Sequence, residues 1–364
     1  MKRHILFVGT FLPSPGFGSS PIVYRHLKRL KDWQISIIAD RGSVRDLEGI
    51  PAHWKIIEAP RHGFGFLGPA YERLPENERP SHIINYFGIN SLSACYLSKK
   101  WGVPLLILLQ DPWEIWARSW IEWYRMKNGG ADIILNHASR IWAVSEALAD
   151  RYRVRNRQVI RIMRPIPEGN SGGFTEWREE FKKGPTAGFS GSFRLHEINY
   201  LRTIAAALEK INGSLIVTTT KNRIAKILLW GHSNVTFEEP SGIEARLASL
   251  KARVDCVLVP FCFGGAGNLW RSFTFPSKLI EFAHTGLPVI ILAPQGVPVS
   301  DWAKEHKWLG YLDTLDAGRI SAFFQQVKDK EFWTKMAQQS RDAASGEFDP
   351  EKIQAQFESE LVVK

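Results

Sequence analysis

The sequence is poor in cysteine, with only Cys95, Cys256 and Cys262 among 364 residues. Three scattered thiols supply neither the ligand spacing of a structural zinc site nor the paired framework of a disulfide-rich secreted protein. The sequence also lacks an Asp-x-Asp metal motif and a GxGxxG dinucleotide motif. We therefore expect no bound metal, no resident cofactor and a reducing, cytoplasmic location.

Long hydrophobic runs are missing as well. The apolar run before Thr10 has about six residues, too few for the apolar core of a signal peptide, so we interpret it as a first buried strand. No later segment reaches the roughly 18 apolar residues that a membrane span needs. At most, we expect a peripheral protein at the inner face of a membrane.

The net charge of +10 is unevenly placed. Residues 1–165 hold 24 Lys and Arg against 14 Asp and Glu, whereas the charges in the rest of the chain balance. A basic half attracts an anionic partner such as lipid headgroups, a phosphorylated acceptor or nucleic acid. Nucleic acid is the remote alternative, because no helix-turn-helix, zinc or RNP-type motif accompanies the charge, and we expect no nucleic-acid partner.

Short apolar runs alternate with amphipathic stretches along the whole chain, which is typical of parallel α/β architecture. We expect strands at 5–8, 35–39, 54–58, 83–87, 105–109 and 141–144, and then at 187–190, 215–219, 235–238, 256–260 and 289–293. The predicted domains are 1–168 and 169–345, followed by a C-terminal helix at 346–364 that could pack back on the first domain. The chain, at 364 residues, is too long to fold around one ordinary domain core, which also favours two domains.

The most informative stretch is 273–290. Pro276 suits the first turn of a helix, Thr274 or Ser277 could cap that helix, and Gly286 could end it. A helix start favours anions, and Lys278 and Arg271 add positive charge close to it.

Glu281 lies three residues after Lys278, where its carboxylate could accept two vicinal hydroxyls. This pattern predicts a site for a diphosphate and a ribose. The alternative is an ordinary surface ion pair between Lys278 and Glu281.

Pro-Ser-Lys-Leu-Ile-Glu-Phe followed by Thr-Gly-Leu-Pro-Val-Ile resembles the donor-site helix of GT-B glycosyltransferases, particularly the family 4-like group (glycosyl transferases group 1). The stretches 188–193 and 134–148 are similar to two further segments of that family. The resemblance implies two Rossmann-like domains that face each other across a cleft. It also implies a nucleoside diphosphate sugar as donor, a retaining reaction without metal, and ribose binding by Glu281. Together, the helix start, the resemblance and the nearby cations predict these donor-binding residues: Gly191, Ser192, Arg194, Arg271, Ser277, Lys278 and Glu281.

The sequence departs from the family pattern at two places. Phe273 stands where the family commonly has a second glutamate, and Ser192 and Glu197 stand near the usual Arg and Lys. Arg194, Arg271 and Lys278 could supply the missing charge. The departures leave open a second hypothesis, a catalytically silent relative that binds sugar nucleotides.

In the first half, the loop with Gly16, Gly18 and Ser19 joins the first strand to the first helix. The glycines allow a tight turn, Ser19 could cap the helix, and the matching loop of GT-B enzymes faces the cleft. Asp111 follows a strand at the sheet edge where α/β proteins place their sites, so it is the candidate catalytic residue. The alternative role for Asp111 is that of N-cap residue of the following helix. The alternative for the loop with Gly16 and Gly18 is an ordinary turn between a strand and a helix.

Four tryptophans recur at the spacing of one helical face: Trp113, Trp116, Trp120 and Trp123. Such a helix could lie at an anionic membrane surface or pack in the core. An arginine-rich run from Arg151 to Arg164 favours the membrane, although a solvated basic face would also explain it. The sequence thus predicts a glycosyltransferase that acts on a glycan or lipid-linked acceptor.

Overall fold

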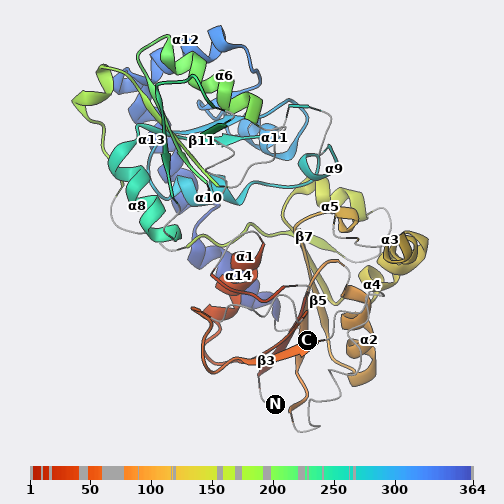
Figure 1. Ribbon diagram of the computed structural model, residues 1–364. Coiled ribbons are helices and arrows are strands. Elements are labelled where there is room, and N and C mark those ends of the chain that lie inside the picture. The colour runs from red at the N-terminus through yellow and green to blue at the C-terminus, as the bar shows by residue number, and fades with distance from the viewer. Residues whose placement is uncertain are drawn as a thin grey trace. The chain divides into compact units, whose positions relative to one another are not determined.

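The computed structural model describes residues 3–9, 11–15, 19–40, 48–59, 78–88, 90–115, 117, 120–153, 159–168, 174–191, 198–219, 226–227, 229–239, 242–261, 263–264 and 268–361. The chain divides into two compact units, which we describe separately (Figure 1). Unit 1 comprises the described residues of Met1–Ile166, Phe273–Phe275 and Glu351–Lys364. Unit 2 comprises those of Pro167–Ser272 and Pro276–Pro350.

Unit 1 contains a parallel sheet of seven strands in the order β3-β2-β1-β4-β5-β6-β7. The strands are β1 (His4–Val8), β2 (Gln34–Asp40), β3 (Lys55–Ala59), β4 (His82–Tyr86), β5 (Leu105–Leu109), β6 (Arg140–Ala143) and β7 (Ile160–Ile162). The helices are α1 (Ser20–Arg29), α2 (Ser91–Trp101), α3 (Trp120–Arg125), α4 (Ala131–His137), α5 (Glu146–Arg153) and α14 (Pro350–Leu361), with a 3-10 turn η4 (Trp113–Ile115) and a π-helical turn η5 (Met126–Gly130).

The central strands of unit 1 are mostly apolar, as expected when helices cover both faces of a parallel sheet. Every residue of β1 and β5 is buried. The strand order reverses between β1 and β4, and a reversal of this kind opens a crevice at the carboxyl edge of a parallel sheet. Loops after these two strands are therefore the natural place for a site in unit 1.

The C-terminal helix α14 belongs to unit 1 from Glu351 onward. Ile353, Phe357 and Leu361 are buried in the core of unit 1. The indole Nε1 of Trp142 on β6 donates a hydrogen bond of 2.7 Å to the Glu360 carboxylate. Unit 1 is therefore completed by residues from the far end of the chain.

Unit 2 contains a parallel sheet of six strands in the order β10-β9-β8-β11-β12-β13. The strands are β8 (Thr186–Ser190), β9 (Ser214–Thr218), β10 (Val235–Glu238), β11 (Cys256–Pro260), β12 (Val289–Leu292) and β13 (Tyr311–Leu312). The helices are α6 (Ile198–Glu209), α8 (Ile243–Arg253), α9 (Asn268–Arg271), α10 (Ser277–Ala283), α11 (Pro298–Glu305), α12 (Ala317–Val327) and α13 (Lys330–Ser345), with a 3-10 turn η6 (Glu179–Lys182). Its order reverses between β8 and β11.

The predicted fold class, two α/β domains with parallel sheets, is confirmed. Short edge strands escaped the sequence analysis: β7 lies inside the arginine-rich run, and β13 has two residues. None of the helices that the structure describes is both long and apolar enough to cross a bilayer.

The predicted single helix that carries the four tryptophans from Trp113 to Trp123 is wrong. Trp113–Ile115 form a 3-10 turn, Ala117 is not helical, and α3 begins at Trp120. Trp113 is buried, and the Tyr152 hydroxyl lies 3.3 Å from its amide nitrogen, whereas Trp120 is 76% exposed. The core holds Trp113 in a tight turn after β5, so Trp113 does not share a helix with Trp120 and Trp123, and Trp116 lies outside the described residues.

Candidate functional site

The carboxyl edge of unit 2 brings Gly191 and Lys278 together. Gly191 follows β8 at the point where the strand order reverses, and its φ of +133° is a conformation that side chains with a Cβ rarely adopt. A Cβ placed there would lie 2.1 Å from Lys278 Nζ. The absence of a side chain at Gly191 therefore leaves room for the ammonium group.

Lys278 lies in the first turn of α10, the helix between β11 and β12. Its Nζ is 5.0 Å from the centre of the Phe189 ring on β8, a cation–π distance. The predicted caps are wrong: Pro276 is the N-cap residue, no side chain caps the helix, and the buried Thr274 hydroxyl has no hydrogen-bond partner. Ser277 is the first helical residue instead.

Two other donor-site candidates are described in unit 2, one on α9 and one on α10. Arg271 ends α9, in the connection that follows β11, and its guanidinium donates a 2.8 Å hydrogen bond to the Gly264 carbonyl. Glu281 lies one turn beyond Lys278 on α10 and is half-buried. Burial lowers the pKa of the neighbouring His284, and the Phe348 carbonyl and the Glu281 carboxylate partly offset this effect. Ser192 and Arg194 lie outside the described residues.

At the carboxyl edge of the sheet in unit 1, hydrogen bonds connect the side chains of Ser19, Tyr86 and Asp111. Tyr86, the last residue of β4, donates a 2.8 Å hydrogen bond to the Asp111 carboxylate, which follows β5. The Ser19 hydroxyl lies 2.9 Å from the same phenol oxygen. A phenol has one proton, and the carboxylate is the stronger acceptor, so Ser19 donates to Tyr86 and Tyr86 donates to Asp111.

These hydrogen bonds bear on two expectations, the capping role of Ser19 and the role of Asp111. Ser19 is the N-cap residue of α1, yet its side chain makes no capping hydrogen bond. Asp111 is 8% exposed and accepts from Tyr86. Burial and the nearby Asp111 charge raise the pKa of Tyr86, so its hydroxyl keeps its proton. Gly16 and Gly18 lie outside the described residues.

Tyr86 is the residue that the sequence analysis missed. It occupies the last position of a buried strand, next to the reversal of strand order, where a polar tip reaches the sheet edge. Behind it, buried amides fix the loops: Asn85 donates to the Val8 carbonyl at 2.7 Å, and Asn90 donates to the Gly9 carbonyl at 2.8 Å. These two hydrogen bonds fix the end of β1 and the residue after it at the carboxyl edge of the sheet.

The arginine-rich run does not form one basic stripe in the described residues. Arg151 pairs with Glu114, Arg153 with Asp150 and Glu146, and Arg161 with Glu360. Arg164 donates to the Val144 carbonyl and stacks on the Phe275 ring at 3.8 Å. These four arginines therefore interact with groups of unit 1 and do not by themselves favour a membrane role, and Arg155 and Arg157 lie outside the described residues.

Phe273 belongs to unit 1 by its packing. The Arg151 guanidinium lies 4.7 Å from the centre of its ring, and Ser145 donates a hydrogen bond to its carbonyl. Phe273, which stands at the place of the second glutamate in the family pattern that the sequence resembles, therefore packs its ring in unit 1.

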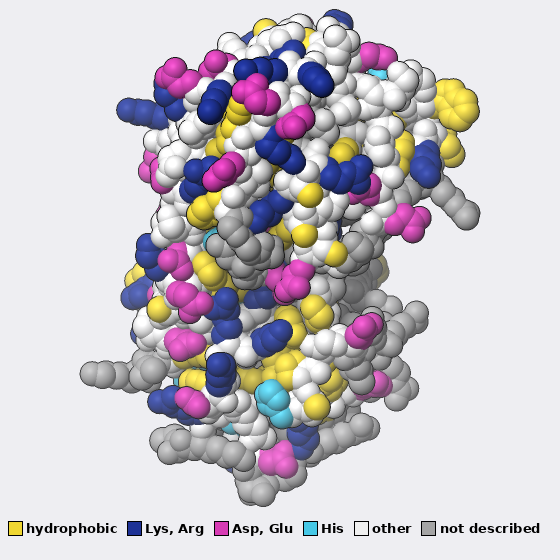
Figure 2. Space-filling model, turned by 90° about the vertical axis from the view of Figure 1, so that its left-hand side faces the viewer, with side chains coloured by type: hydrophobic (Ala, Val, Ile, Leu, Met, Phe, Trp, Pro, Cys, Tyr) yellow, Lys and Arg dark blue, Asp and Glu magenta, His cyan; other side chains and the backbone are white. Residues whose placement is uncertain are grey.

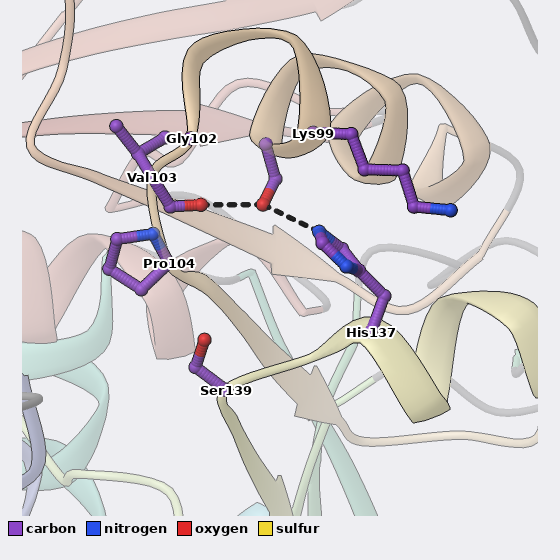
Figure 3. Close-up of a pocket in the computed structure, with 7 residues that line it drawn as sticks. Lys99, Gly102, Val103, Pro104, His137 and Ser139 are labelled. Carbon is purple, nitrogen blue, oxygen red and sulfur yellow. Dashed lines mark hydrogen bonds between the residues drawn. The ribbon is translucent and has the colours of Figure 1, made fainter.

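A cavity of about 590 Å³ lies elsewhere in unit 1, between the C-terminal ends of α2 and α4 (Figure 3). The Ser98 hydroxyl donates to the Val103 carbonyl at 2.6 Å, so it accepts from His137 Nε2 at 2.9 Å. Burial lowers the pKa of His137, and the charge of Lys99 lowers it further. Neither Asp111 nor any donor-binding candidate lines this cavity, and its Ser98 hydroxyl and His137 imidazole are hydrogen-bonded to each other.

Among the described residues, no group of three or more His, Cys, Asp or Glu side chains is placed to hold a metal ion. Two of the three cysteines, Cys95 and Cys256, are free thiols and buried. The third, Cys262, lies outside the described residues.

The chain is similar to solved structures over nearly its whole length. Sucrose-phosphate synthase from Thermosynechococcus elongatus superposes with a TM-score of 0.70 at 15% identity, covering 98% of both chains. HepE of Anabaena, in complex with UDP and glucose, has a TM-score of 0.68 at 16% identity over 99% of both chains. WaaG, a glycosyltransferase involved in lipopolysaccharide biosynthesis, has a TM-score of 0.62 at 13% identity, covering 99% of this chain and 100% of WaaG.

These neighbours are GT-B glycosyltransferases, so the fold that the sequence resemblance implied is confirmed. At these identities the likeness shows the fold. No family model and no curated protein matches the sequence.

Proposed function

We propose that this protein is a glycosyltransferase that binds a nucleoside diphosphate sugar in unit 2. The observation that carries the proposal is the pairing of Gly191 with Lys278 at the reversal of strand order. In an open parallel sheet, ligands bind at this point, beyond the carboxyl ends of the strands. The solved structure of HepE with UDP-glucose supports a nucleotide sugar as the ligand class.

The chemistry of the proposed donor site follows from its charges. Lys278 presents an ammonium group beside a residue without a side chain, so a diphosphate can approach both the backbone and the charge. Arg271, at the end of α9 in the connection between β11 and β12, adds a second cation, and Glu281 offers a carboxylate to the ribose hydroxyls. Loss of the diphosphate leaving group builds negative charge, and fixed cations stabilise that charge without a metal.

Unit 1 holds the proposed catalytic group, Asp111. Its carboxylate is fixed by Tyr86, which is fixed in turn by Ser19, so it can orient an acceptor or sugar hydroxyl at a defined angle. We assign the acceptor to the class of glycans or lipid-linked glycans, the reaction to the retaining type, and the location to the cytoplasm, at the periphery of the membrane. These assignments rest on the resemblance and on the charge of residues 1–165.

The experiment is a turnover assay over a panel of nucleoside diphosphate sugars, in which release of the nucleoside diphosphate is followed with and without glycan acceptors. The proposal predicts turnover with one base, retained nucleotide binding and at least about 100-fold slower turnover in Asp111→Asn. Asp32→Asn, an exposed aspartate of unit 1, is the matched control. Equal turnover in both variants would remove Asp111 from the mechanism.

A second candidate function is favoured by Phe273, which stands at the place of the second glutamate in the family pattern that the sequence resembles. In that case the protein binds a sugar nucleotide without transferring the sugar. Nucleotide binding with neither sugar transfer nor slow hydrolysis of any donor would establish this alternative. Measurable transfer would exclude it.

A further inference from the structure

One flank of unit 1 exposes large hydrophobic side chains. We call it the α2–α4 flank, formed by α2, α3, η5 and α4. Trp120 is 76% exposed, Tyr124 58%, Ile133 55%, Tyr96 45% and Trp123 39%. Burying such rings stabilises a protein, so a cluster of exposed ones on neighbouring elements indicates an interaction surface.

The elements of the α2–α4 flank are neighbours in space (Figure 1). Helices α2 and α4 contact each other, and η5 contacts both α3 and α4. Inside η5, Gly129 has a φ of +100°, which interrupts the helical geometry between α3 and α4. A Cβ on the next residue, Gly130, would lie 2.7 Å from the Arg125 carbonyl oxygen. Gly129 and Gly130 therefore interrupt the regular helix between α3 and α4.

The exposed charged side chains that the structure describes on the α2–α4 flank are all basic, and the side chain of Glu122, on α3, lies outside the described part. Within 91–137, the described side chains that are both exposed and charged are Lys99, Lys100, Arg125 and Lys127, and every described acidic side chain there is buried or half-buried. The Lys127 ammonium lies 4.3 Å from the centre of the Trp123 ring. By contrast, Figure 2 shows basic and acidic side chains mixed over the side of the molecule that lies on the left in Figure 1.

We propose that the α2–α4 flank docks on an anionic lipid bilayer. Tryptophan and tyrosine are the side chains that partition to the headgroup level of a membrane, and lysine and arginine beside them contact lipid phosphates. A folded protein partner would need complementary pockets for the rings, whereas a bilayer interface accepts exposed rings on a convex helix. The proposal is independent of the donor site in unit 2, so either can fail alone.

The experiment is co-sedimentation of the full chain with vesicles of phosphatidylcholine alone or with about one third phosphatidylglycerol. Wild type is expected to bind the anionic vesicles and to lose affinity as salt is raised. The double variant Trp120→Ala/Trp123→Ala is expected to bind at least tenfold more weakly. The matched control is Trp230→Ala, an 85% exposed tryptophan of unit 2, which is expected to bind as wild type does.

Charge is tested by Arg125→Glu/Lys127→Glu, which is expected to weaken binding at least about 20-fold, since each basic residue near the surface contributes about fivefold. Lys210→Glu/Lys304→Glu, two exposed lysines of unit 2, is the control. Circular dichroism and the thermal midpoint establish that each variant is folded, and substitutions at exposed positions are expected to preserve both.

Three outcomes would overturn the proposal. The wild type could fail to bind anionic vesicles, or it could bind both vesicle types equally. The variants of the flank could bind as tightly as their controls. A dimer of the wild type that dissociates in Trp120→Ala/Trp123→Ala, without any vesicle binding, would assign the flank to self-association instead.

Discussion

The substitution Gly191→Ala tests the geometry of the donor site because it affects the protein in two separable ways. First, alanine is strained at a φ of +133°. Second, the new Cβ would lie 2.1 Å from Lys278 Nζ and 2.4 Å from its Cε. The clash involves the far end of a flexible side chain, so we expect Lys278 to swing away while the backbone stays in place.

The two effects have different magnitudes and different readouts. Strain of this kind costs about 1–3 kcal/mol of unfolding free energy, which is about 2–12 °C of thermal midpoint in a domain of this size. Displacing an ammonium group from a phosphate removes a charge-assisted hydrogen bond of about 1.5–3 kcal/mol, which is about a 10- to 100-fold loss of nucleotide affinity.

Gly231→Ala is the matched control for Gly191→Ala. Gly231 lies in unit 2 with a φ of +91°, and a Cβ there meets no atom within 4 Å. Both variants should therefore lose stability in thermal unfolding, but only Gly191→Ala should lose affinity in isothermal titration with nucleoside diphosphates. If Gly191→Ala binds the nucleotide as wild type does, the assignment of the Gly191–Lys278 pair to the donor site is refuted.

Three further predictions concern unit 1. Tyr86→Phe removes the hydrogen bond to Asp111 and should lower kcat at least tenfold while nucleotide affinity stays unchanged; a change in affinity alone would contradict the proposed role. Phe357→Ala should destabilise unit 1 by about 3–5 kcal/mol in urea unfolding because the ring is fully buried, and a loss below about 1 kcal/mol would mean that α14 is peripheral to the core. Burial lowers the pKa of His26 to about 4, so below about pH 6.5 the unfolded chain takes up a proton that the folded one does not. Stability should therefore fall between about pH 6.5 and pH 4, by on the order of 3 kcal/mol, and His26→Gln should lack this slope in urea unfolding; an equal slope in both proteins would contradict the cause.

The central strands could be predicted because each buries a mostly apolar run. Leu105–Leu109 and Cys256–Pro260 begin and end where the sequence pattern placed them. The candidates Arg271, Lys278 and Glu281 were found from the residue types around one helix start. Gly191 could be placed with them only through the resemblance, since its position beside Lys278 depends on the order in which distant strands pair.

The errors have local physical causes. The tryptophan spacing over 113–123 suggested one helix, but the core binds Trp113 in a turn directly after β5. The arginine-rich run suggested a basic stripe, but its described members pair with carboxylates and carbonyls of unit 1. The spacing of residue types along the sequence does not show whether these residues share an exposed helical face or contact residues far away in the chain.

The central claim, that unit 2 binds a nucleoside diphosphate at the Gly191–Lys278 pair, is tested most directly by thermal unfolding with UDP, GDP, ADP, TDP or CMP. A ligand at 100 times its dissociation constant adds about 2.7 kcal/mol of stability. We predict that one nucleoside diphosphate stabilises the wild type and the control Lys304→Ala, but neither Lys278→Ala nor Glu281→Ala. Stabilisation of Lys278→Ala equal to that of the wild type, or no stabilisation by any of the five nucleotides, would contradict the claim.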